Sequence, residues 1–280
     1  MSESLQPYYR PLGSTGMMVS PLGLGTVKLG RDQGVKYPAA FEIPDDQAAT
    51  RLLALARELG INLLDTAPAY GRSEERLGWL LKGQRQQWVI VGKVGEEFQD
   101  GKSLFDFSAA HTQFSVERSL KRLGTDYLDM VLVHSNGDDL AILQDTEVYP
   151  TLAALKQQGK IRAFGFSGKT LAGNLQALDQ GDCAMVAYNL AYQEEAPVLD
   201  RALRDSKAIL VKKAFNSGKA CLAPGADPIA ASLELVLGHA GVTSTIVGTI
   251  NPGHLTHNVA VAVRLLKTTT TGQTTGPEHR

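Results

Sequence analysis

Short apolar segments alternate with longer amphipathic segments along most of the chain. The short segments are rich in Val, Ile and Leu, and several are apolar at consecutive positions, which is typical of strands buried on both faces of a parallel sheet. This pattern predicts eight strands, at residues 21–26, 61–67, 88–94, 127–134, 163–168, 185–190, 208–213 and 244–249.

The longer segments carry apolar residues at the three- and four-residue spacing of a helix face. The first of these segments starts with Pro44 and Asp45 and ends at Gly60, and these residue types are common at the start and the end of a helix. Helices are predicted at residues 45–59, 73–81, 108–123, 144–158, 171–179, 197–206, 227–238 and 252–266. Eight strands that alternate with eight helices are the set that a closed (β/α)8 barrel, or TIM barrel, requires, and we expect this α/β fold.

An open, doubly wound sheet is the structural alternative. It commonly begins with a G-x-G-x-x-G turn, and the chain contains no such turn, so the barrel is favoured. The turn-like sequence Gly13-Ser14-Thr15-Gly16 predicts an N-terminal β-hairpin that closes the bottom of the barrel. Residues 267–280 are rich in Thr, Gly, Gln and Pro, so we expect a single barrel domain at 1–266 and a disordered tail at 267–280.

Composition narrows the class of protein. The 280 residues suffice for one barrel of about 250 residues, and a net charge of −1 gives no indication of nucleic acid or an anionic membrane as a partner. The N-terminus lacks the pattern of a secretory signal, and no apolar run approaches the length of about 18 residues expected of a membrane span. The two cysteines, Cys183 and Cys221, are too few for a metal cluster; we expect inert thiols, no metal and a cytoplasmic location.

Ionisable residues stand at the ends of three consecutive predicted strands. Asp65, Lys93 and His134 occupy these ends, and Tyr70 follows Asp65 in the adjoining loop. Barrel active sites lie at the carboxyl ends of strands, and neighbouring strands are about 4.8 Å apart. We therefore expect these four side chains to meet in one pocket.

This combination of side chains suits proton transfer to a carbonyl oxygen. A phenol titrates near pH ~10, and a nearby ammonium group lowers that pKa while a carboxylate holds the ammonium in place. Histidine can donate a hydrogen bond to the carbonyl oxygen of a substrate. Because no side chain supplies hydride, the chemistry implies a nicotinamide cofactor, with Tyr70 as the proton donor.

Each of these residues also has an ordinary structural explanation. Asp65 could cap a turn, Tyr70 could be a packed loop aromatic, and Lys93 and His134 are of types often found as solvated or structural side chains. Their joint placement favours a functional set. By contrast, the adjacent pair Glu194-Glu195 is expected to be a solvated loop face.

The chain resembles the aldo-keto reductases over about residues 9–266. The matching stretches are Gly23-Leu24-Gly25-Thr26, residues 62–71 (NLLDTAPAYG), Gly92-Lys93-Val94, residues 119–129 (SLKRLGTDYLD) and Leu132-Val133-His134. The resemblance implies that Tyr70 is the general acid/base, that Lys93 and Asp65 tune it, and that His134 orients the substrate. It also implies a small carbonyl or alcohol substrate and a monomer, with Val27 in a place where a large aromatic often lines the pocket.

The resemblance further implies a cofactor that lies across the barrel mouth. The positions implied to contact it are Gly25, Thr26, Asp65, Ser167, Lys212, Gly248, Thr249, His254 and Asn258. Three positions depart from the family pattern: Gly168 replaces an asparagine, Val186 a glutamine and Lys212 a stacking aromatic. His254 stands where a basic residue often pairs with the 2′-phosphate, so NADP(H) is favoured and NAD(H) stays open.

Three hypotheses follow from these observations. The first is an oxidoreductase that interconverts aldehydes or ketones and alcohols. The second, motivated by the altered cofactor positions, is a redox-sensing or regulatory protein of the same fold that binds cofactor with little turnover. The third is an isomerase or lyase that uses the same strand ends without a nicotinamide.

Overall fold

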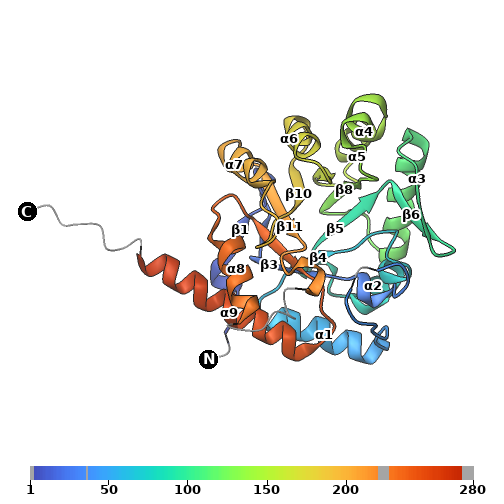
Figure 1. Cartoon of the computed structure of the whole chain (residues 1–280). Coiled ribbons are helices and arrows are strands. Elements are labelled where there is room, and N and C mark those ends of the chain that lie inside the picture. Colours follow the sequence, from blue (N-terminus) through green and yellow to red (C-terminus); the bar gives the residue numbers. More distant parts are fainter. Residues whose placement is uncertain (1–2, 36, 220–226, 273–280) are drawn as a thin grey trace, which may run out of the picture.

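Eight parallel strands close into a barrel (Figure 1). The structure is a computed structural model that describes residues 3–35, 37–219 and 227–272. The barrel strands in chain order are β3 (Leu22–Gly25), β4 (Leu63–Asp65), β5 (Val89–Val94), β8 (Met130–His134), β9 (Phe164–Ser167), β10 (Cys183–Ala187), β11 (Ala208–Lys212) and β12 (Ser244–Val247). Pairing of β12 with β3 closes the ring. The predicted barrel and its eight strands are confirmed.

Helices surround the barrel on the outside, as Figure 1 shows. They are α1 (Asp46–Glu58), α2 (Ser73–Leu80), α3 (Ala109–Leu123), α4 (Asp139–Asp145), α5 (Val148–Gln157), α6 (Leu171–Gln180), α7 (Ala196–Arg204), α8 (Pro228–Gly238) and α9 (Pro252–Gly272). The helix predicted at 144–158 is wrong at its start, because the extended backbone of Thr146 separates α4 from α5. In the described part of the chain, no helix has the length and apolarity needed to cross a membrane.

Side chains from the sequence fix several helix ends. Asp45 accepts a hydrogen bond from the Ala48 amide at 2.7 Å, and Asp227 accepts one from the Ile229 amide at 3.0 Å. Such caps contribute about 1 kcal/mol each because the first helical amides have no partner within the helix. Gly124 ends α3 in the left-handed conformation, with φ 63°, which glycine adopts without strain.

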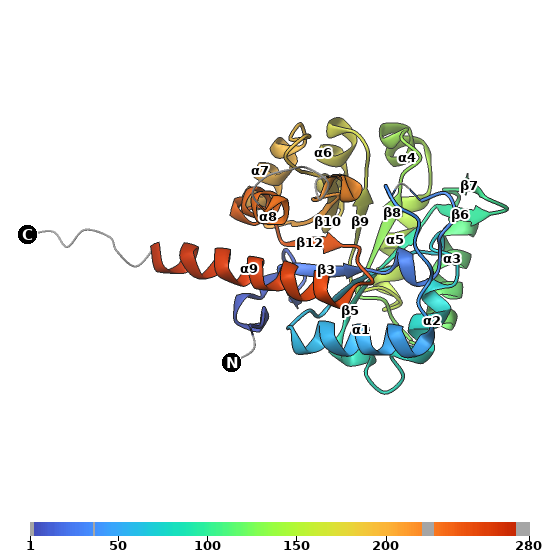
Figure 2. The same cartoon turned by 60° about the horizontal axis from the view of Figure 1, so that its bottom comes forward.

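Helix α9 is longer than predicted. It lies against α8 and α1, and it continues to Gly272, into the segment expected to be disordered. In Figures 1 and 2 its C-terminal end extends away from the barrel. The Thr-rich extension has no apolar pattern of its own, but lengthening a formed helix requires no new nucleation.

Alternate residues of each strand form two apolar layers. Leu63, Val91, Leu132 and Met185 belong to the cluster inside the barrel, whereas the intervening residues pack toward the helices. Leu12 and Val19 join the inner cluster from the predicted N-terminal hairpin, which pairs β1 (Arg10–Pro11) with β2 (Met18–Val19). The inner cluster also contains Cys183, and its burial raises the pKa of the thiol, as expected of an inert residue; Cys221 lies outside the described residues.

A second hairpin, absent from the prediction, follows the barrel strand β5. It pairs β6 (Glu96–Gln99) with β7 (Lys102–Phe105), and Figure 2 shows it projecting at one edge of the barrel. Asp100 and Gly101 form the turn with φ values of 51° and 77°. An Asp-Gly pair is a strong signal for a two-residue hairpin turn, so the sequence carried the information to predict it.

Candidate active site

Strand geometry decides which side chains reach the barrel mouth. Side chains alternate along a strand, so the inward positions of Leu63, Val91 and Leu132 place the residue two further along each strand inward as well. These residues are Asp65, Lys93 and His134. The same alternation turns Ser167 and Lys212 inward at the ends of β9 and β11, and Ser167 stands beside His134 in the sheet register.

Lys93 and Asp65 form a buried ion pair. The Lys93 ammonium donates to Asp65 Oδ1 and to the Thr66 carbonyl oxygen at 3.1 Å, and the two side chains are almost fully buried. Buried charges persist in a fold only where they are paired and hydrogen-bonded. The Lys93 Nζ atom also lies 5.0 Å from the centroid of the Tyr70 ring, so its charge faces the phenol.

Tyr70 lies beside this pair as a neutral phenol. Its hydroxyl donates to Asp65 Oδ2 over a long 3.4 Å, which makes a weak hydrogen bond. Burial, followed by the carboxylate of Asp65, raises the pKa of Tyr70 well above its ordinary value. The expectation of a lowered pKa is therefore wrong for this structure, because burial and the Asp65 carboxylate outweigh the effect of the nearby Lys93 ammonium.

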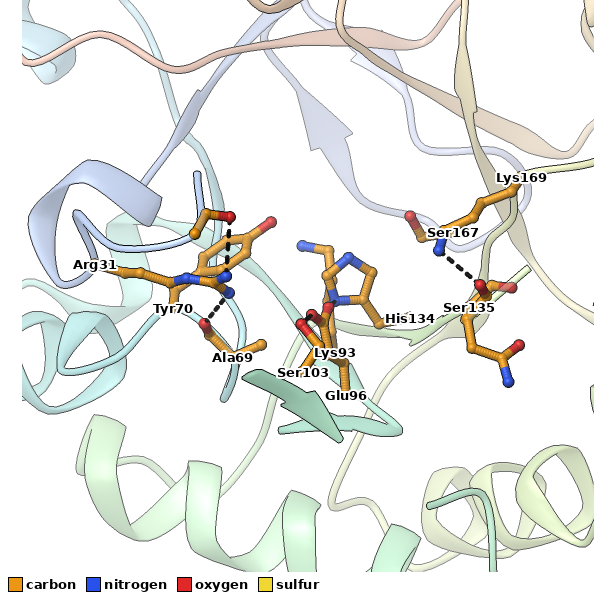
Figure 3. Close-up of polar contacts among 12 residues, drawn as sticks. Arg31, Ala69, Tyr70, Lys93, Glu96, Ser103, His134, Ser135, Ser167 and Lys169 are labelled. Atoms are coloured by element: carbon orange, nitrogen blue, oxygen red, sulfur yellow. Dashed lines mark hydrogen bonds and ion pairs between the residues drawn. The ribbon is translucent and has the colours of Figure 1, made fainter. Parts of the chain in front are cut away.

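His134 contacts a carboxylate that was not among the predicted site residues. Its Nδ1 atom lies 2.6 Å from Oε2 of Glu96, the first residue of β6. Figure 3 shows the side chains of Tyr70, Lys93 and His134 close together, with Glu96 beside His134. Burial alone would raise the pKa of Glu96, but the contact with His134 and its charge lower it to about 2. Burial lowers the pKa of His134, although Glu96 opposes this shift.

Arg31 joins three segments at the rim of the site. Its guanidinium donates to the Ala69 carbonyl oxygen at 3.0 Å, in the loop that carries Tyr70 (Figure 3), and lies 3.3 Å from the ring centroid of Phe98 in β6. Arg31 therefore links the loop after β3 to both the Tyr70 loop and the β6–β7 hairpin. Val27, the predicted pocket residue, is half-buried at the start of the short helix that follows β3.

Lys212 forms a second polar cluster at the mouth. Its ammonium donates to the Ser167 hydroxyl at 2.9 Å and to the Gly168 carbonyl oxygen at 2.7 Å. Burial, with a further contribution from the charge of Lys213, lowers the pKa of Lys212 to about 7, and the carboxylate of Glu195 opposes the shift. Lys212 is consequently a mixture of amine and ammonium near neutral pH.

Glu195 is buried, so the expectation of a solvated Glu194-Glu195 face is wrong for this residue, although Glu194 is exposed. Asn174 explains the burial, since its amide nitrogen donates to Glu195 Oε2 at 2.6 Å. Asn174 also accepts a hydrogen bond from the Gly168 amide at 3.2 Å. A Cβ atom on Gly168 would stand 2.3 Å from Asn174 Oδ1, which accounts for glycine in place of the family's asparagine.

The remaining predicted cofactor positions surround the same mouth. Gly25 ends β3, and Thr26 is fully buried, with its hydroxyl donating to the Asp65 carbonyl oxygen at 2.9 Å. Gly248 and Thr249 follow β12. At the start of α9, His254 is exposed and Asn258 is buried one turn further on. The backbone of Thr26 is used within the fold as well, since its amide donates to the Asp65 carbonyl oxygen and its carbonyl oxygen accepts from the Leu29 amide, each at 2.9 Å.

These residues fit a dinucleotide. The absence of side chains at Gly25 and Gly248 permits close approach, and the helix dipole at the N-terminus of α9 favours phosphate, with the His254 amide already donating to Asn251 Oδ1 at 3.2 Å. Ser167 and Lys212 supply polar groups on the inner side of the mouth. Val186, by contrast, packs in the outer layer between barrel and helices and cannot provide the contact of the family's glutamine. Among the described residues, no group of three or more His, Cys, Asp or Glu side chains could hold a metal ion.

Comparisons with known proteins agree with this fold. The sequence model of the Aldo/keto reductase family matches residues 21–223. A crystal structure from Pseudomonas aeruginosa, assigned to the aldo-keto reductases, is 61% identical, covers 94% of this chain and 97% of that chain, and has a TM-score of 0.87.

Curated relatives match over shorter lengths. L-galactose dehydrogenase of Arabidopsis thaliana is 37% identical over 190 residues, which are 65% of this chain and 55% of the relative. NADH-specific methylglyoxal reductase of Escherichia coli is 32% identical over 208 residues, which are 70% of this chain and 60% of the relative. The chain thus spans little more than half the length of these curated relatives.

Proposed function

Since the chain belongs to the aldo/keto reductase family, we propose that it is an oxidoreductase that interconverts a hydroxyl and a carbonyl group with a nicotinamide cofactor. One observation carries the proposal: the buried Lys93–Asp65 pair lies beside the neutral phenol of Tyr70, with His134 on the same mouth. A positioned proton donor next to a cation is the arrangement that carbonyl reduction requires.

Each residue has a distinct part in this proposal. Tyr70 gives its proton to the carbonyl oxygen in reduction and receives it back in oxidation. Its raised pKa keeps the phenol protonated at neutral pH, so the site holds a proton ready for reduction. The charge of Lys93, fixed by Asp65, stabilises the phenolate as it forms. The cofactor, when bound, supplies or accepts the hydride.

The cofactor that we propose is NADP(H), with NAD(H) as the alternative. Ser167 and Lys212 are suited to the nicotinamide end and the start of α9 to the phosphates. His254 adds a donor in the first turn of α9, where a 2′-phosphate would be favoured by the helix dipole. The name of the Escherichia coli relative specifies NADH, so both cofactors belong in the test.

The proposed substrates are small aldehydes or ketones and the matching alcohols. Several relatives carry names of sugar dehydrogenases, namely L-galactose dehydrogenase, D-arabinose 1-dehydrogenase and D-threo-aldose 1-dehydrogenase. Aldoses are therefore the first compounds to test in the oxidation direction. The monomeric state, the single domain and the cytoplasmic location stay predictions.

A redox-sensing or regulatory protein is the second candidate. Lys212 in place of a stacking aromatic, and Gly168 in place of an asparagine, favour it because both alter the surroundings of the nicotinamide. Titration with NADPH and NADH by tryptophan fluorescence, followed by aldehydes and aldoses with nicotinamide absorbance recorded, separates the two functions. Binding with turnover supports the enzyme, binding without turnover supports the regulatory protein, and absence of binding contradicts both.

A further inference from the structure

Glu96 is held with both carboxylate oxygens engaged. Oε1 accepts a hydrogen bond from the Ser103 hydroxyl at 2.6 Å, across the hairpin, and Oε2 lies 2.6 Å from Nδ1 of His134. The Glu96 side chain is 12% exposed. A carboxylate with two partners, on a strand that is itself paired with β7, has little freedom to leave the histidine.

The contact determines which nitrogen of His134 carries the hydrogen. Nδ1 of His134 lies 2.6 Å from an ionised carboxylate, which can only accept a hydrogen bond, so we assign the hydrogen of the neutral imidazole to Nδ1. In neutral imidazole the other nitrogen, Nε2, is then an acceptor with a free lone pair. The expected donation of a hydrogen bond from neutral His134 to a carbonyl oxygen does not fit this tautomer.

The surroundings of His134 decide its charge. Burial lowers its pKa, as do the ammonium groups of Lys93 on β5 and Lys212 on β11, while Glu96 on β6 raises it. The Tyr70 ring packs edge-to-face on the imidazole with centroids 6.3 Å apart. Because the lowering contributions prevail, His134 is mostly neutral at neutral pH, and its free Nε2 is a base at the mouth of the barrel.

We propose that Glu96 is a positioning residue that makes His134 the final proton acceptor when a hydroxyl substrate is oxidised. This inference rests on the proposed function and concerns the same site. The substrate O–H bond breaks and its proton passes to the Tyr70 oxygen, while the phenolic proton passes to Nε2 of His134. The electron pair of the substrate C–H bond leaves as hydride to an oxidised nicotinamide dinucleotide, and the C=O bond forms. Glu96 then neutralises the imidazolium, and reduction follows the reverse path.

With His134 as the proton acceptor, Tyr70 can take up the substrate proton during oxidation even though its own hydroxyl is protonated. A phenol with a raised pKa cannot accept a proton unless it passes its own proton on. The long 3.4 Å bond from Tyr70 to Asp65 is weak enough for the hydroxyl to turn to another acceptor. Lys93 engages Oδ1 of Asp65, and its positive charge makes the whole carboxylate a weaker base, so the Nε2 atom of His134 is the stronger candidate for the proton.

The first test is a proton titration of the histidine itself, which requires no substrate. Imidazole signals of the full chain are followed by NMR against pH, and His134 is identified by its loss in His134→Asn. Glu96→Gln removes the charge and keeps the shape, so the pKa of His134 should fall by about one unit or more. Glu97→Gln is the matched control, because Glu97 is the next carboxylate and contacts Arg118 and His111 instead.

The second test is the pH profile of hydroxyl oxidation. In the wild type kcat should rise with pH through the pKa of His134 and then level off. In Glu96→Gln the rise should move to lower pH and the plateau should fall about 100-fold, with KM and cofactor binding retained. Glu96→Asp, which keeps the charge, should return the rise toward its wild-type position, whereas Glu97→Gln should match the wild type.

The outcomes separate this inference from the proposed function. An unchanged His134 titration in Glu96→Gln overturns the positioning role, whatever the rate. An unchanged plateau with a shifted titration overturns the role of His134 as proton acceptor. If the wild type oxidises no hydroxyl substrate, the proposed function fails, while the titration still decides whether Glu96 sets the protonation of His134. If Glu96→Gln does not fold, Glu96→Asp serves for both measurements, with a smaller shift expected from the withdrawn carboxylate.

Discussion

Lys212 donates a hydrogen bond to the Ser167 hydroxyl at 2.9 Å, although β10 separates their strands in the barrel. The lysine side chain therefore passes over the end of β10. Ala187 ends that strand, and by the alternation of the barrel it faces inward with a side chain small enough to leave room. The buried amine of Lys212 thus lies on one side of the barrel mouth, and the Lys93–Asp65 ion pair lies at the same mouth.

Replacement of this amine by an apolar side chain should change how stability depends on pH. The pKa of Lys212 is lowered to about 7 in the folded protein, so between about pH 7 and 10.5 the unfolded chain binds more protons and the wild type gains stability as pH rises. Lys212→Met removes this dependence. Its melting temperature relative to the wild type should be highest near pH ~6 and decline toward pH ~9. A difference that is constant across this range would contradict the assigned burial.

Tyr70→Phe should remove turnover and leave the fold intact. The lost hydroxyl makes one weak hydrogen bond, whereas a positioned acid/base group contributes about 100-fold or more to the rate. Steady-state kinetics and cofactor titration measure the two effects. Tyr149→Phe is the control, because this buried tyrosine also has a raised pKa and its hydroxyl bonds the Ala177 carbonyl oxygen away from the mouth. Full activity in Tyr70→Phe would refute the proposed role.

Gly168→Ala should destabilise the protein and weaken cofactor binding. The added Cβ would stand 2.3 Å from Asn174 Oδ1 and 2.9 Å from Asp139 Oδ2, both within a buried network, so the loop after β9 must shift. The expected loss is about 1–3 kcal/mol in the free energy of unfolding, measured by urea denaturation. Gly238→Ala in α8 is the control, since no atom lies within 4 Å of its added Cβ. Equal stability of the two variants would show that the loop is not constrained as described.

His254 should distinguish the two forms of the cofactor. His254→Ala should weaken NADPH binding about 2- to 5-fold, the size of a charge effect at a helix N-terminus, and leave NADH binding unchanged. His254→Arg should strengthen NADPH binding. His257→Ala is the control, because His257 pairs with Asp227 at 3.0 Å. Equal changes for both cofactors would place the 2′-phosphate elsewhere.

The barrel and the convergence of Asp65, Lys93 and His134 followed from short-range patterns. Apolar runs located the strands, and the two-residue alternation turned their last residues inward. Glu96 is not among the predicted site residues, because the strand predicted at 88–94 stops before it and the hairpin turn at Asp100-Gly101 is not part of the prediction. The protonation of Tyr70 could not be predicted either, since it depends on how deeply the phenol is buried and how close the Asp65 carboxylate lies in three dimensions.

The β6–β7 hairpin has a consequence for how proteins of this architecture diversify. Glu96 lies in the segment that connects β5 to α3, outside the strands of the barrel. Exchange of a single connecting segment can therefore supply or withdraw the carboxylate that faces the strand-end histidine, with every strand and helix of the frame unchanged. Under the role proposed for Glu96, two proteins that share the three strand-end residues and the loop tyrosine can differ in how fast they oxidise a hydroxyl substrate, and the connecting segment is where that difference is to be sought.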